Sequence, residues 1–365
     1  MTRPEHAAED QVRRLRSGAQ LLHRPRRLPP AALVRHLTGV QAQVLSAAGL
    51  ALRARGAGLT APEVDRARLG DRTVVLSWAM RGTLHLVSTQ DFGWLLPPVI
   101  EPQVTNAYRR LQQEGVPAGQ AADALRSIQQ MLEREGPLTR REIAERLRAR
   151  GVRVEGQAIA HLVWLAAAQG IVCFGPDRAR EQCFVLVRDW IGEPEPMERD
   201  AALAELAARY LGAHHPAAPS DLAAWSGLGQ RDAKRAWRLI EDRLVEVETT
   251  QGTLWSLRTT PDPAPAGLVR LLPAFDEYLL GWRGRDLTVG AEHRTRINRG
   301  GGWLHPVVLV DGRAAGTWRT ERVPGALRLR VEAFTELDAA VRDSVLVEAR
   351  ELSTFLGHAV EVVLA

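Results

Sequence analysis

Apolar residues along this chain follow two spacings, one typical of helices and one typical of strands, and the two alternate in a repeated order. Between residues 123 and 187, three amphipathic stretches precede two short runs rich in β-branched and aromatic residues. Thr139 and Glu142 have the spacing of a capping box, which marks the start of the second helix. The predicted elements are helices over 123–134, 140–150 and 155–169 and strands over 171–174 and 182–187. Three helices closed by a β-hairpin are typical of a winged helix.

The same order occurs once downstream and once, more loosely, upstream. Downstream it predicts helices over 200–211, 220–225 and 230–242 and strands over 244–248 and 253–257. Upstream it predicts helices over 8–22 and 30–37, a third helix ending at 55, strands over 74–78 and 83–87, and a helix that Ser88 caps. The chain therefore contains three candidate winged helices in tandem.

The pattern changes after the proline-rich segment 261–265. The remaining chain predicts strands over 269–272, 307–310, 327–331 and 359–364 and one helix over 337–355. We therefore expect an α+β fold in which three winged-helix units precede a β-rich, barrel-like domain. The expected domains are 1–115, 116–195, 196–262 and 263–365.

Composition excludes several classes of protein. Hydrophobic residues make up 45% and charged residues 25% of the 365 residues, as in soluble globular proteins, and no apolar stretch is long enough to span a bilayer. The first ten residues are polar and include acidic ones, unlike a signal peptide, so we expect a cytoplasmic protein. The two cysteines provide neither a disulfide framework nor a zinc set. We expect no metal, no cofactor, no membrane contact and a monomeric state.

Charge favours nucleic acid as the partner. The formal net charge of +5 mildly favours a polyanionic partner, and the repeated winged-helix order makes DNA the expected one. A basic, glycine-rich segment over 292–303, which we expect to be a loop or hairpin tip, offers phosphate contacts, and the first predicted hairpin offers more. The candidates are Arg294, Arg296, Asn298 and Arg299 in the segment and Arg81 and His85 in the hairpin. For the segment, a solvated loop without function is the alternative.

Two glutamines, Gln41 and Gln43, lie just after Gly39. On a regular helix, side chains two residues apart diverge by roughly 200°, so these amides would not converge. They can share one site only in extended backbone or at the start of a helix. Gly39 makes such a start plausible here.

These residues resemble a known family. Residues 37–43 (LTGVQAQ) resemble the glutamine–apolar–glutamine motif of the AlkZ-type DNA glycosylases. That winged-helix superfamily also contains the YcaQ-type enzymes, in which aspartate replaces the second glutamine. The further similar stretches are 81–85 (RGTLH), 272–282 (LPAFDEYLLGW), 303–306 (WLHP) and 307–318. Together they extend over nearly the whole chain.

The resemblance implies a C-shaped scaffold of the three winged helices and the barrel-like domain around a DNA channel. It implies that the partner is double-stranded DNA carrying N7-alkylated purines and that Gln41 and Gln43 are catalytic. Members with two glutamines are similar to self-resistance enzymes that remove bulky adducts or crosslinks made by DNA-alkylating natural products. The channel-spanning hairpin of the family is expected to correspond to 294–303.

The chemistry leaves alternatives open. An N7-alkylated purine is already cationic and leaves easily, so two amides that orient water and contact the sugar or phosphate could suffice. Asp276 and Glu277 are the alternative catalytic residues, because a carboxylate is the usual activator of water. Lys234 is the only lysine, which argues for hydrolysis without a Schiff base. A non-enzymatic DNA-binding regulator and a protein-interaction scaffold are the competing functions.

Overall fold

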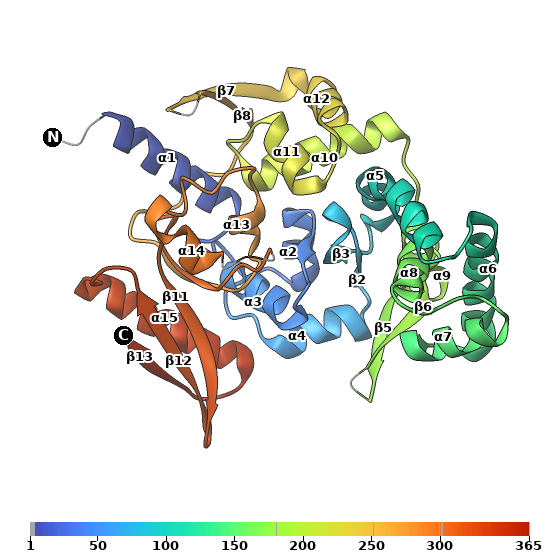
Figure 1. Ribbon diagram of the computed structural model, residues 1–365. Helices are drawn as coiled ribbons and strands as arrows, with labels where there is room; N and C mark the ends of the chain where they lie inside the picture. Colours follow the sequence, from blue (N-terminus) through green and yellow to red (C-terminus); the bar gives the residue numbers. More distant parts are fainter. Residues whose placement is uncertain (1–3, 180, 251, 299, 301, 365) are drawn as a thin grey trace.

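The computed structural model describes residues 4–179, 181–250, 252–298, 300 and 302–364. Figure 1 shows the N-terminal stretch of chain, from α2 to β3, at the centre of the molecule, with the later stretches arranged around it. Among the described residues, no helix is both long enough and apolar enough to cross a membrane.

The elements occur in the predicted order, with additions. The first stretch contains α1 (Pro4–Ala19), α2 (Pro30–Leu37), β1 (Val40–Gln41), α3 (Leu45–Arg55), α4 (Ala61–Asp65), the π-helical turn η1 (Arg66–Gly70), β2 (Val74–Trp78), the 3-10 turn η2 (Met80–Gly82), β3 (Leu84–Ser88) and α5 (Phe92–Gln113). The second contains α6 (Ala118–Glu135), β4 (Leu138–Thr139), α7 (Arg140–Ala149), α8 (Ala158–Ala168), β5 (Val172–Arg178), β6 (Glu181–Leu186) and α9 (Val187–Ile191).

The third and fourth stretches complete the chain. The third contains α10 (Arg199–His214), α11 (Pro219–Ser226), α12 (Gln230–Arg238), η3 (Glu241–Arg243), β7 (Leu244–Thr249) and β8 (Gly252–Leu257). The fourth contains β9 (Val269–Leu272), α13 (Glu277–Leu280), η4 (Ala291–His293), α14 (Arg294–Ile297), β10 (Val307–Val310), β11 (Arg313–Val323), β12 (Ala326–Ala333), α15 (Ala339–Leu356) and β13 (Val360–Leu364).

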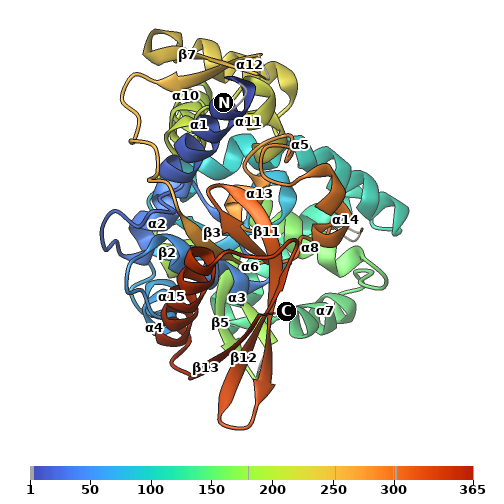
Figure 2. The ribbon, with the colours of Figure 1, turned by 90° about the vertical axis from the view of Figure 1, so that its left-hand side faces the viewer.

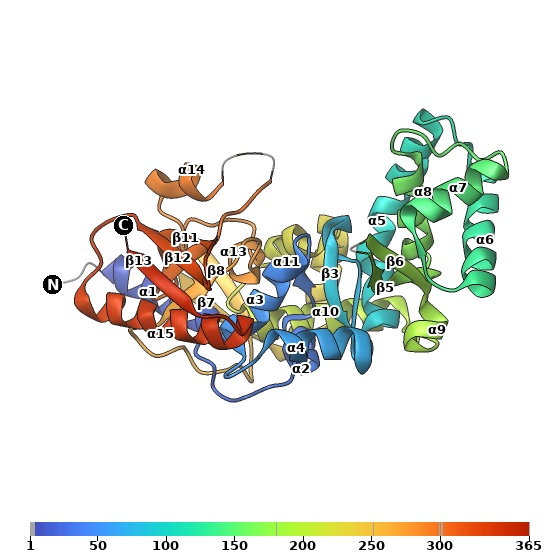
Figure 3. The same ribbon diagram turned by 90° about the horizontal axis from the view of Figure 1, so that it is seen from below.

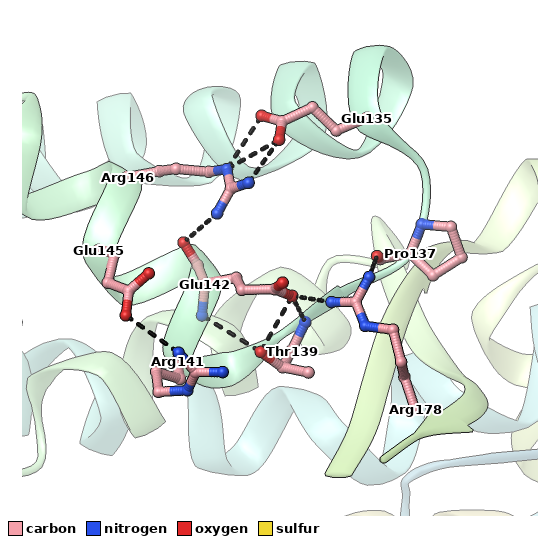
Figure 4. A network of polar contacts seen from close by, with 8 residues as sticks. All are labelled: Glu135, Pro137, Thr139, Arg141, Glu142, Glu145, Arg146 and Arg178. Carbon is pink, nitrogen blue, oxygen red and sulfur yellow. Dashed lines mark hydrogen bonds and ion pairs between the residues drawn. The ribbon is translucent and has the colours of Figure 1, made fainter.

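Local signals explain where the predicted helices begin. Thr139 and Glu142 form the capping box at the start of α7: Glu142 N donates to Thr139 Oγ1 at 3.2 Å, and Thr139 N donates to Glu142 Oε2 at 2.8 Å (Figure 4). Arg146, one turn further along α7, donates to both carboxylate oxygens of Glu135 on α6. The capping box starts α7, and the ion pair links it to the end of α6.

One sheet joins the first two stretches. The six strands have the order β1-β3-β2-β5-β6-β4, and β2 meets β5 at Leu76 and Phe174. The ring of Trp78 packs against that of Phe174, with centroids 4.8 Å apart, and so covers the junction. The short strand β1 is an edge of this sheet, so the backbone of the glutamine motif is held by β3.

The C-terminal sheet differs from the predicted barrel. Its five strands have the order β13-β12-β11-β10-β9, so that, within the described residues, β13 and β9 are edges and the sheet is open. Helix α15 packs along one face through Val345, Ala349 and Leu352, as Figure 2 shows for the helix beside β12 and β13. Because a helix already buries this apolar face, the sheet does not need to close on itself. The barrel-like expectation was therefore wrong, whereas the mixed α+β class is confirmed.

Buried ion pairs attach the C-terminal sheet to helix α3. Glu348 on α15 is 1% exposed and accepts from Arg53 Nη1 at 3.0 Å and from Leu271 N at 3.1 Å. Nitrogens of Arg24 and Arg270 lie 2.9 and 3.5 Å from its other oxygen. Burial by itself would raise the pKa of Glu348, but the three arginines outweigh burial and lower it below 4.5.

We expect Glu348→Gln to lower the free energy of unfolding at pH 7 by about 3 kcal/mol, because it leaves three arginines without their counter-charge. A carboxyl whose pKa is lowered on folding stabilises the protein above its unfolded pKa, and this stabilisation is lost as pH falls through its folded pKa. Urea unfolding should therefore give a constant difference from the parent between pH 8 and the usual glutamate pKa of 4.5, and a shrinking difference below it.

The matched control is Glu361→Gln on β13, which removes an exposed pair with Arg328 at 3.3 Å. Surface pairs of this kind contribute about 0–1 kcal/mol. Equal effects of the two substitutions would contradict the account of Glu348.

Candidate active site

The backbone is extended at the first glutamine of the motif. Gln41 ends β1 and pairs with His85 of β3, Ala42 N donates to Leu84 O at 2.7 Å, and α3 begins only at Leu45. The chain bends at Gln43, just after the strand, and Gln41 and Ala42 are buried whereas Gln43 is exposed. The extended arrangement is thus present at Gln41, whereas the helix start that Gly39 suggested is not, since α3 begins four residues later.

The two glutamines differ in their surroundings. Gln41 is 7% exposed, and its amide and backbone are both held by other residues, whereas Gln43 is exposed. The motif thus presents one fixed amide and one that solvent or DNA can reach.

Three residues hold Gln41 in a closed ring of hydrogen bonds. Gln41 N donates to Glu277 Oε1 at 2.7 Å, and Trp225 Nε1 donates to Glu277 Oε2 at 3.1 Å. Arg81 Nη2 donates to Gln41 Oε1 at 2.6 Å, and Arg81 Nη1 donates to the carbonyl oxygen of Trp225. We call these four residues, Gln41 included, the Gln41 ring. They come from β1, the β2–β3 turn, α11 and α13, which are widely separated in sequence.

The turn that carries Arg81 has unusual backbone geometry. Arg81 has φ 57° and the following Gly82 has φ 70°, so two successive residues are left-handed. A non-glycine residue in this region is uncommon and carries strain, which proteins retain mainly at functional positions. Gly227 at the end of α11 permits the close approach on the other side, because a Cβ there would lie 3.0 Å from Arg81 N. Local sequence therefore brings α11 directly against this turn.

The ring contains two opposite charges, and burial acts on both. Burial raises the pKa of Glu277, and the positive charge of Arg81 opposes that rise. Burial lowers the pKa of Arg81, and Glu277 opposes that change in turn. Both hydrogen bonds to Glu277 come from N–H donors, which suits the carboxylate form. The ring is therefore close to neutral while it contains an anion and a cation.

The predicted alternative catalytic carboxylates are both in the interior. Asp276 accepts from Arg55 Nη1 at 2.9 Å and Arg55 Nη2 at 2.8 Å, and its Oδ1 also accepts from Tyr278 N at the start of α13. Asp276 and Glu277 are both 0% exposed. These contacts favour a structural role for Asp276 and a supporting role for Glu277 rather than the activation of water by either.

His85 also lies in the interior, beside Gln41. It is 0% exposed and its Nδ1 is 2.9 Å from Thr83 O. Burial, and after it the charge of Arg81, lower the pKa of His85 to about 3, so the imidazole is neutral at physiological pH. A side chain without exposed surface does not reach DNA, so this position does not fit the predicted DNA contact.

Comparison with known proteins identifies the family. The model of the family described as "DNA glycosylase AlkZ-like" matches residues 34–355, which include the glutamine motif and the whole Gln41 ring. The chain belongs to the AlkZ-like DNA glycosylase family. The resemblance inferred from the sequence is therefore confirmed.

Relatives of this AlkZ-like protein agree in sequence and in structure. An interstrand DNA cross-link repair glycosylase from Streptomyces sahachiroi is 34% identical over 323 residues, which are 80% of this chain and 83% of the relative. The structure of Streptomyces sahachiroi DNA glycosylase AlkZ matches with a TM-score of 0.82 and 27% identity, over 98% of this chain and 99% of that one. As an AlkZ-like glycosylase the chain is an enzyme that cleaves N-glycosyl bonds, so the regulator and scaffold alternatives are set aside.

The basic segment of this glycosylase is partly helical. Residues 291–297 form η4 and α14, so the predicted loop begins only at Asn298, whose Oδ1 accepts from Gly300 N at 3.1 Å. Arg294 is exposed and lies 2.6 Å from Asp286, and the guanidinium of Arg296 stacks over Phe334 at 4.5 Å. Arg299 lies outside the described residues. Figure 3 shows α14 and α8 rising on the same side of the central elements α11, β3 and α13.

A cavity that the sequence did not indicate opens beside the Gln41 ring. It has a volume of about 410 Å³ and shares Arg81 and Gly82 with the β2–β3 turn. Its other lining residues include Gln103 and Asn106 from α5 and His161 and Trp164 from α8. These residues are isolated positions on two helices and form no motif, so only the packing of α5 on α8 brings them together. Trp225, on α11, was also not predicted as a site residue, because it too is an isolated position that forms no motif.

We expect the arginines of the basic segment to contribute to DNA binding. Alanine at Arg294, Arg296 and Arg299 together should weaken duplex binding and flatten the dependence of log K on log salt by roughly 0.9 for each phosphate that is no longer neutralised. Fluorescence anisotropy over a range of salt concentrations measures this slope.

The matched control replaces three arginines of the β11–β12 hairpin, Arg319, Arg328 and Arg330, which lie near carboxylates of the same sheet. An unchanged salt slope in the first variant, or an equal change in the control, would support the alternative that the basic segment is a solvated loop without function.

Proposed function

We propose that this AlkZ-like glycosylase is a monofunctional enzyme that hydrolyses the glycosidic bond of N7-alkylated purines in double-stranded DNA. Its substrates include bulky adducts or interstrand crosslinks made by DNA-alkylating natural products, and its role is self-resistance. The observation that supports this most is the Gln41 ring, which holds a neutral amide beside an exposed second amide. The name of the Streptomyces sahachiroi relative, a cross-link repair glycosylase, agrees with it.

The ring suits a leaving group that is already activated. Neutral amides are weak bases, so they accelerate only the departure of a base that needs little protonation, and an N7-alkylated purine carries a positive charge already. Gln41 Oε1 accepts from Arg81, so the NH₂ group of Gln41 is the part that donates to DNA, and its natural acceptor there is a phosphate oxygen. The exposed Gln43 then orients the water that captures the cationic sugar.

Hydrolysis without a Schiff base follows from the position of the single lysine. Lys234 is exposed on α12 and belongs to neither the Gln41 ring nor the cavity beside it. A lyase that cuts the strand needs an amine at the reacting sugar carbon. The expected product is therefore an abasic site in an intact strand.

The cavity beside the ring supports bulky substrates. Apart from Arg81, whose guanidinium is engaged in the ring, its walls are uncharged amides, an indole and an imidazole whose pKa burial lowers. Such a lining suits a planar neutral substituent rather than a phosphate. A crosslinked base stays tethered to the opposite strand and cannot be fully extruded, so an open subsite fits such a substrate better than a closed pocket.

We expect Gln41→Ala and Gln43→Ala each to slow single-turnover release of N7-methylguanine by about 10²-fold, the usual effect of removing one transition-state donor, with little change in DNA affinity. Gln43→Asp should retain activity on this substrate, since a carboxylate also orients water. Base release and abasic sites in unbroken strands are the two readouts.

Gln130→Ala, on the exposed surface of α6, is the control for the loss of a glutamine. Full single-turnover rates in well-folded Gln41→Ala and Gln43→Ala would refute the mechanism. A thermal unfolding curve of each variant separates a loss of fold from a loss of chemistry.

We expect Trp164→Ala to discriminate between substrates. Loss of the indole should lower kcat/KM for a bulky aromatic N7 adduct by about tenfold, since one stacked ring contributes about 1–3 kcal/mol, and leave N7-methylguanine release nearly unchanged. Trp190→Ala, which removes a half-buried indole stacked on Arg72, is the control. An equal fall for both substrates would show that the cavity is not a subsite for the substituent.

A further inference from the structure

We propose that Arg81 is the positioning residue for Gln41: its guanidinium holds the amide oxygen, so that the NH₂ end of Gln41 is the end presented to the DNA. The inference rests on the proposed function, because it requires Gln41 to act in the transition state. It also changes the role of Arg81, which the sequence suggested as a contact to DNA.

The argument begins with the two ends of an amide. The oxygen and the NH₂ group of glutamine have nearly the same shape, so packing alone selects poorly between the two orientations. A guanidinium has only donors. Arg81 Nη2 at 2.6 Å from Gln41 can therefore face only the oxygen, because the flipped amide would set donor against donor. The NH₂ group is then fixed in the opposite direction.

Arg81 is itself anchored. Its Nη1 donates to the carbonyl oxygen of Trp225, so rotation of the guanidinium away from Gln41 breaks a second hydrogen bond. Trp225 is 0% exposed, and its indole is bound to the same carboxylate that binds the backbone of Gln41. Glu277 and Arg81 thus each bridge Gln41 to Trp225, one through backbone and indole N–H groups, the other through amide and carbonyl oxygens. A closed ring of this kind removes the freedom of each member to move alone.

The same geometry argues against a phosphate contact. Both terminal nitrogens of Arg81 already have acceptors within the protein. The basic segment offers exposed guanidinium groups, of which Arg294 is paired only at the surface. The two N–H groups that face Gln41 and Trp225 are engaged, so a phosphate that approached Arg81 would find only its remaining N–H groups.

A double-mutant cycle between positions 81 and 41 tests the inference. Arg81→Met should lower the single-turnover rate at saturating enzyme by about 10–10²-fold, approaching the effect of Gln41→Ala, with DNA affinity and its salt slope within about twofold of the parent. In the Gln41→Ala background, Arg81→Met should have less than about a twofold further effect, because a residue that acts through Gln41 has nothing left to position.

Arg81→Lys is measured in the same cycle and keeps the test intact if the methionine variant is poorly folded. A lysine keeps the charge and can donate to one of the two acceptors, so it should restore part of the rate lost in Arg81→Met. Arg209→Met is the matched control: this half-buried arginine pairs with Asp91 and Glu205 outside the ring and should leave the rate unchanged.

Two outcomes would overturn the proposed role of Arg81, and a third would overturn the proposed function. Weaker DNA binding and a flatter salt slope in Arg81→Met, with an unchanged rate at saturation, would make Arg81 a DNA contact. Multiplying effects in the double variant, with a slow Gln41→Ala, would show that Arg81 acts independently of Gln41. A full rate in Gln41→Ala would instead refute the proposed function on which the inference rests.

Discussion

Two adjacent buried carboxylates hold the segment that carries the glutamines. Asp276 binds both terminal nitrogens of Arg55 at the end of α3, and Glu277 binds the backbone of Gln41 just before that helix, 236 positions away in sequence. Burying two carboxylates is costly unless each is paired and hydrogen-bonded, and here both are. The geometry of the motif therefore depends on the docking of the C-terminal stretch and not on local helix propensity.

The contacts of Glu277 also limit the net positive charge beside the proposed reacting group. The proposed substrate and its transition state are cationic, so an unpaired arginine beside Gln41 would oppose the reaction. Glu277 offsets the charge of Arg81 within the ring, and His85 adds none because burial holds its pKa at about 3. A guanidinium can therefore orient the amide with little net positive charge near the sugar.

The features that the sequence predicted are those that interactions between near neighbours in the chain determine. The start of α7 follows from the capping box of Thr139 and Glu142, and the extended backbone at Gln41 was one of two arrangements expected there. The helical start of the basic segment and the open C-terminal sheet were missed, because the glycines of 300–302 favour a loop and because α15 covers the sheet only in the folded chain. The Gln41 ring draws on four distant segments, so no spacing in the sequence could reveal that Arg81, Trp225 and Glu277 meet.

The ring also gives a physical reason for the pattern by which the two branches of the superfamily differ. As the resemblance implies, the YcaQ-type enzymes have aspartate in place of the second glutamine only. At position 41 a carboxylate could still accept from Arg81, but it would lose the NH₂ group and place a second negative charge near Glu277, which already accepts the backbone N–H of that residue. Position 43 is exposed and lies outside the ring, so an anion there keeps its hydration while it orients water. Aspartate is thus compatible with position 43, whose side chain is exposed, and is disfavoured at position 41, whose side chain belongs to the Gln41 ring.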